Sequence, residues 1–228
     1  MFHLPRRAAG AAPAGVNAAG QATPVPSAWM QGRRVTQLLV GLVLYGIGVG
    51  VVLVAGLGVD PWTVLAQGLS IRTGIGIGWI TNILGLVVLA LWIPLRQRPG
   101  VGTVANIFVV GTALQLALPL IPRPQSLLES GAMLVSGVLI VGIAGGLYIG
   151  ARFGPGPRDG LMTGISARWG WPLWTARTLV EVTVLIIGWT LGGTVGVGTL
   201  VYAAAIGPVS HAALRVLDTR RSPFRRRA

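Results

Sequence analysis

Six long apolar blocks, five of them without a single charged side chain, divide this sequence. Each is close to the roughly 20 helical residues that cross a bilayer core of about 30 Å. Backbone N–H and C=O groups in hydrocarbon must be satisfied within the chain, so each block predicts a helix despite its many Val and Ile residues. The blocks run over residues 35–57, 75–95, 101–121, 131–151, 173–191 and 195–214.

The composition excludes an ordinary soluble domain. Only 10% of the residues are charged and 53% are hydrophobic, whereas soluble domains carry about 25% charged residues. The chain has no Cys and only two His residues, so we expect no disulfide, no metal site and no cofactor. No nucleophile has a base beside it, and we expect no enzymatic activity. We therefore predict an all-α polytopic membrane protein.

The charge is strongly basic, at +13, and every basic residue is Arg. Most arginines lie in the tails and in alternate gaps between blocks, which is the positive-inside pattern rather than a nucleic-acid surface. Six spans with both termini cytoplasmic then follow. We expect residues 1–34 to be a disordered cytoplasmic tail. Residues 215–228 form a basic cytoplasmic tail that favours anionic lipid headgroups.

Two shorter stretches, 60–70 and 156–166, interrupt the pattern after blocks one and four. Asp60 followed by Pro61 is typical of a helix N-cap with Pro at the first helical position, and Pro157 occupies the same place in the second stretch. Both stretches are too short to span. We predict two short re-entrant or interfacial helices.

The sequence also repeats itself at an offset of 96 residues, with twenty identities over positions 41–111. Each copy holds a span, a short helix and two further spans, giving repeats at 35–122 and 131–214. Three spans per copy is an odd number, so the second copy enters the membrane upside down. The sequence therefore predicts six transmembrane helices as a 3+3 inverted repeat, an arrangement typical of transporters.

Charged residues inside the apolar region are the first candidates for a site. Arg177 and Glu181, four apart on block five, share one helix face, and a charge at that depth needs a partner or a wet cavity. Arg158 and Asp159 open the second short helix. We expect these four to form one network, either a substrate or coupling site or a structural clamp, and Asp60 to act as a cap or a ligand.

Neutral polar and aromatic residues give weaker signals. Asn82 and Asn106 lie within spans, where they bond neighbouring helices or line a polar pathway. Most tryptophans fall near predicted span ends and are interpreted as interfacial anchors. Glycines spaced by four on blocks one and four predict close helix packing.

Several motifs together resemble a known family: Gly58-Val-Asp-Pro-Trp62, Gly100-Val-Gly-Thr103, Gly156-Pro-Arg-Asp-Gly160, Arg177 with Glu181, and Gly188-Trp-Thr-Leu-Gly-Gly193. Over residues 35–212 the chain resembles the YczE/YyaS/YitT group of bacterial membrane proteins, and the YczE branch in particular. The resemblance implies a multi-pass protein of the plasma membrane and adds little about its chemistry.

These observations favour a transporter or permease of a small-molecule solute. The alternative is a membrane scaffold or regulator that transports nothing and binds a partner protein or lipid through the glycine surfaces and the basic tail.

Overall fold

The computed structural model describes residues 28–218, and the side chains of 31–218. Every regular element in that range is helical, which confirms the all-α class. The predicted tails lie outside the described residues except for 28–34 and 215–218. The elements are α1 (Ala28–Ala55), α2 (Pro61–Thr73), α3 (Ile77–Leu91), α4 (Val101–Ala117), the 3-10 turn η1 (Leu118–Leu120), α5 (Leu127–Gly150), α6 (Pro157–Trp169), α7 (Leu173–Thr190) and α8 (Val197–Leu217).

Five stretches of helix within the described range are long and apolar enough to cross a membrane: Gln31–Ala55, Val101–Leu120, Leu127–Gly150, Leu173–Thr190 and Val197–Leu217. A sixth crossing is added if α2 and α3, which meet at an angle of 116°, count together as one broken span. The chain is therefore a polytopic membrane protein with five to six candidate spans.

The second predicted span differs most from its expected bounds of 75–95. Helix α3 has 15 residues and ends at Leu91, so at about 1.5 Å per residue it is shorter than a bilayer core. Pro94 accounts for the early end, because its ring would collide with the carbonyl of residue 90 in a continued helix. Both short predicted helices are present, as α2 and α6.

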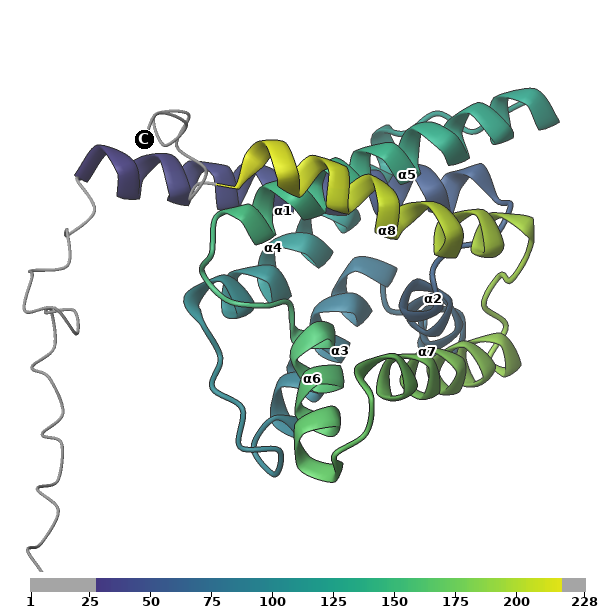
Figure 1. The fold of residues 1–228 in the computed structure, drawn as a ribbon. Helices are drawn as coiled ribbons and strands as arrows, with labels where there is room; N and C mark the ends of the chain where they lie inside the picture. The colour runs from purple at the N-terminus through teal and green to yellow at the C-terminus, as the bar shows by residue number, and fades with distance from the viewer. Residues whose placement is uncertain (1–27, 219–228) are drawn as a thin grey trace, which may run out of the picture. The chain divides into compact units, whose positions relative to one another are not determined.

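Residues 34–218 belong to one compact unit, and all contacts below lie within it. Helix α5 packs along α8, while α2 packs on α7 and α3, and α6 packs on α3 and α7 (Figure 1). The glycines of α1 allow close approach, as the sequence predicted. A Cβ at Gly41 would lie 2.8 Å from the Tyr148 nitrogen of α5, and one at Gly46 would lie 2.8 Å from the Ala113 Cβ of α4.

Several contacts recur at an offset of 96 residues. The N–H of Gly102 donates to the carbonyl of Phe153 at 2.9 Å. Gly198, 96 residues after Gly102, donates to Leu57, 96 residues before Phe153, at 2.7 Å. These hydrogen bonds tie the start of α4 to the loop before α6, and the start of α8 to the loop before α2.

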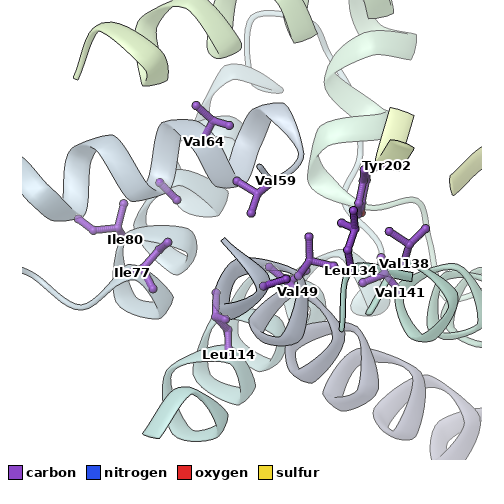
Figure 2. Packing of buried hydrophobic residues seen from close by; sticks show 13 residues of the cluster. Val49, Val59, Val64, Ile77, Ile80, Leu114, Leu134, Val138, Val141 and Tyr202 are labelled. Carbon is purple, nitrogen blue, oxygen red and sulfur yellow. The ribbon is translucent and has the colours of Figure 1, made fainter. Parts of the chain in front are cut away.

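The largest buried cluster joins these helices from within. It includes Val49 of α1, Ile80 of α3, Leu114 of α4, Val141 of α5 and Tyr202 of α8 (Figure 2). Large apolar side chains on the outer helix faces are instead exposed, as lipid-facing residues are. This packing fixes the ends of the short helices, where the polar residues gather.

Candidate functional site

The two short helices begin differently, although both have Pro at the first helical position. The Asp60 carboxylate caps α2 by accepting from the Thr63 N–H at 3.3 Å, and it also accepts from the Thr63 hydroxyl. Gly156 occupies the matching place before α6 and provides no side-chain cap. The N-terminus of α2 is therefore capped by a carboxylate, and the N-terminus of α6 has no side-chain cap.

An ion pair joins these two helix starts. Arg158 Nη1 donates to Asp60 Oδ1 at 3.1 Å. The Arg158 guanidinium also lies 5.2 Å from the centre of the Trp62 ring, within range of a cation–π attraction. Asp60 is thus a cap and an ion-pair partner at once, and the N-terminal ends of α2 and α6 meet.

Helix α7 supplies the second ion pair. Arg177 Nε donates to Glu181 Oε1 at 3.0 Å within one helix face, as the i,i+4 spacing predicted. These side chains are 56% and 32% exposed. The expected network of four charges is therefore divided, because Arg158 pairs with Asp60 of the other short helix.

Asp159 is the third carboxylate of this region. It lies in the first turn of α6 and is half-buried. Tyr148 donates its hydroxyl to Asp159 Oδ2 at 3.4 Å, which is long for a hydrogen bond between oxygens.

These side chains surround one cavity of about 310 Å³. Six of the seven candidate residues line it: Asp60, Asn106, Arg158, Asp159, Arg177 and Glu181. The seventh, Asn82, does not. It is buried between α3 and α4, where its Nδ2 donates to the Thr112 hydroxyl at 3.2 Å.

Sequence reasoning missed the aromatic wall of the cavity. All three tyrosines of the chain, Tyr45, Tyr148 and Tyr202, line it. Each stands alone as the one phenol in an apolar block, which was the signal available in the sequence. The interfacial-anchor interpretation is wrong for Trp62 and Trp92, which are 6% and 2% exposed, and Trp62 also lines the cavity.

Residues lining the cavity come in pairs separated by 96 positions. Eight such pairs account for sixteen of the twenty-three lining residues. They are Asp60 and Gly156, Pro61 and Pro157, Trp62 and Arg158, Thr81 and Arg177, Gly85 and Glu181, Asn106 and Tyr202, Ile107 and Ala203, and Val110 and Ile206. Corresponding positions of the sequence repeat therefore face the same space.

A further ion pair lies outside the cavity. Arg152 Nε donates to Asp218 Oδ1 at 2.9 Å, and this hydrogen bonding raises the pKa of Arg152 above its ordinary value.

Within residues 28–218, no three side chains of the metal-ligating types gather at one point. The polar groups that line the cavity include two guanidiniums, three carboxylates and three phenols.

Long apolar helices around a charged cavity define a multi-pass membrane protein. Residues 32–215 match the model of a family of unknown function, DUF6198, and the chain belongs to this family. The resemblance to YczE and YyaS is confirmed by the relatives below.

Three relatives are similar over most of their length. An uncharacterized protein of Haemophilus influenzae is 37% identical over 82% of this chain and 86% of its own. The uncharacterized membrane protein YczE of Bacillus subtilis is 28% identical over 76% and 82%. The uncharacterized protein YyaS of Bacillus subtilis is 24% identical over 78% and 91%. No solved structure matches the chain.

Proposed function

We propose that this protein transports a small polar solute across the plasma membrane and catalyses no chemical reaction. The observation that carries the proposal is the cavity, where the starts of two short helices meet and charged residues from α2, α6 and α7 converge. Charges within an apolar helix assembly are costly unless they bind a partner or line a wet path. A substrate site in a membrane transporter has these properties.

An inverted 3+3 repeat is part of the same proposal, with repeats at 35–122 and 131–214. The reciprocal hydrogen bonds of Gly102 with Phe153 and of Gly198 with Leu57 support it, because a two-fold axis would interchange them. Close glycine contacts repeat in the same way. Gly41 meets Tyr148, and Gly137, 96 residues later, meets Val52, which corresponds to Tyr148 in the other copy.

Six crossings follow if α2 and α3 act together as one broken span. The two copies would then cross in opposite senses, and the paired lining residues support a cavity on the axis between them. A site at that position stays in place while one repeat rocks against the other, which opens it to each side in turn.

The proposed orientation puts both termini in the cytoplasm, since Arg33, Arg34, Arg96, Arg98 and the C-terminal arginines then lie inside. The tail at 215–228 would there meet the anionic lipids of the inner leaflet, each nearby Arg contributing about 1 kcal/mol.

The test is uptake into proteoliposomes that contain the purified protein, across a panel of cationic, anionic, zwitterionic and neutral solutes. We expect saturable uptake of at least one class and its loss in Glu181→Gln, which leaves Arg177 without its partner. Asp218→Asn, an acid-to-amide change outside the cavity, is the matched control and should retain uptake.

Absence of uptake for every class, together with an unchanged cell phenotype in Glu181→Gln, would contradict transport. Stable co-purification with a partner protein would then favour the scaffold function, in which the glycine surfaces and the basic tail bind a protein or lipid.

A further inference from the structure

The cavity holds one more carboxylate than guanidinium. Arg158 has Asp60 at 3.1 Å and Arg177 has Glu181 at 3.0 Å, so each cation is matched. Asp159 attracts both guanidiniums at longer range. Among the described residues, neither guanidinium comes within ion-pair distance of Asp159, and the hydroxyl of Tyr148 donates to it at the long distance of 3.4 Å.

The start of α2 provides no cation for Asp159. Asp60, at the start of α2, receives a cation from Arg158 at the start of α6. Asp159 brings a carboxylate to the start of α6, and the position that corresponds to Arg158 on α2 is Trp62. Trp62 carries no charge, and Asp159 itself corresponds to Thr63, so the repeat supplies no symmetric ion-pair partner for Asp159.

An anionic ligand fits this place less well. The start of α6 lacks a side-chain cap and so carries a partial positive charge. Asp159 lies in that first turn and already supplies the negative charge that the helix start favours. A second carboxylate beside Asp159 would meet like-charge repulsion at low dielectric.

The walls suit a cation. The rings of Tyr45 and Tyr148 meet edge to face with centres 6.1 Å apart, and Tyr202 also lines the space. Aromatic faces attract ammonium groups, most strongly where water is excluded. Tyr148 connects the aromatic wall to the carboxylate, because its ring belongs to this wall and its hydroxyl contacts Asp159.

The volume limits the size of the ligand. A cavity of about 310 Å³ is large enough to hold several water molecules. A small aliphatic amine fits this space with some of its water.

We propose that the cavity binds its solute through a positively charged ammonium group, held by the Asp159 carboxylate against the tyrosine rings. This inference rests on the proposed transport function and names the chemical class of the solute.

Thermal unfolding of the purified protein in detergent tests it directly, because a ligand that binds the folded state raises the unfolding temperature. The probes are methylammonium and propylammonium chloride, sodium propionate and propan-1-ol, all at one ionic strength. We expect the two ammonium ions to raise the unfolding temperature, with propionate and propanol having no effect. Stabilisation by propionate, or none by either ammonium ion, overturns the proposal.

Variants locate the binding group. Asp159→Asn should weaken the apparent affinity for propylammonium at least about tenfold, equivalent to one lost charged contact of about 1.4 kcal/mol. Asp218→Asn makes the same chemical change in the ion pair outside the cavity and should leave affinity unchanged. If Asp159→Asn does not fold, Asp159→Glu replaces it and must retain the ammonium response. Undiminished binding in Asp159→Asn contradicts the assignment.

Flux measurements separate this inference from the transport proposal. Uptake of a carboxylate or a neutral solute that Asp159→Asn leaves intact would overturn the ammonium site and support transport. Ammonium binding without uptake of any solute would support the site and contradict transport.

Discussion

Arg158 on α6 lies 3.1 Å from Asp60 at the start of α2, and this ion pair is the bond between the two short helices. Asp60 is only 6% exposed. Its carboxylate also accepts from the Thr63 N–H. Asp60 therefore both caps α2 and forms the ion pair with Arg158. Loss of Asp60 therefore affects two elements together.

We predict that Asp60→Asn destabilises the protein by about 1–3 kcal/mol, because it removes the ion-pair partner of the half-buried Arg158 guanidinium. Arg158→Gln should also destabilise the protein. The double variant should lose less free energy of unfolding than the sum of the losses in the two single variants. Unfolding in detergent, arranged as a double-mutant cycle, measures the coupling. Asp218→Asn, in an ion pair with the exposed Arg152 outside the cavity, should destabilise less. Additive effects of the two cavity substitutions would show that the pair is not coupled.

Two glycines of α5 provide a matched comparison of helix packing. A Cβ at Gly137 would lie 2.6 Å from Val52 Cγ2, whereas one at Gly131 would meet nothing within 4 Å. We predict that Gly137→Ala destabilises by about 1–3 kcal/mol through overpacking. Gly131→Ala should stabilise by up to about 1 kcal/mol through helix propensity. The measurement is the unfolding temperature of each variant, and shifts of the same sign would contradict the close contact between α5 and α1.

The helices were predictable from local signals. Asp60 with Pro61, and Pro157, indicated the two short helices because capping and fixed φ are local effects. The start of α5 was misplaced by four residues, at 131 instead of Leu127. The signal lay in Ser126 and Glu129, where the Ser126 hydroxyl accepts from the Glu129 N–H at 3.2 Å, a capping pattern visible in the sequence.

The site was predictable only in part. Spacing alone paired Arg177 with Glu181, since four residues bring side chains together on a helix. The partner of Arg158 was not predictable in this way, because Asp60 lies 98 residues away and the pair depends on how α2 and α6 meet. Tryptophans at block ends likewise divide into exposed ones such as Trp174 and buried ones such as Trp62 according to tertiary packing.

The absence of cysteine from the chain makes its topology directly measurable. Single cysteines at Arg98 and Gln125, both exposed positions outside the helices, should react from opposite sides of the membrane. In the proposed orientation Arg98→Cys reacts from the cytoplasm and Gln125→Cys from outside. An impermeant thiol reagent applied to intact cells and to inverted vesicles reads this out with no background from the parent chain. Reaction of both from one side would contradict a crossing by α4 and, with it, the inverted repeat.

The two asparagines proposed from the sequence should behave oppositely. Asn82 lies buried between α3 and α4, where its Nδ2 donates to Thr112 and its Oδ1 has no partner among the described residues. Asn82→Ala should therefore cost only about 1 kcal/mol of stability, since helix–helix hydrogen bonds in membranes contribute about 0.6 kcal/mol on average. It should leave the ammonium-dependent rise in unfolding temperature unchanged.

Asn106 lines the cavity and corresponds to Tyr202 at an offset of 96 residues. Asn106→Ala should leave the unfolding temperature without ligand nearly unchanged, because it removes a half-buried side chain from the wall of a cavity. It should instead reduce the ammonium response and solute uptake, because it replaces a polar group at the binding surface with a methyl group. A larger ligand effect in Asn82→Ala than in Asn106→Ala would show that the solute path runs between α3 and α4 rather than through the cavity.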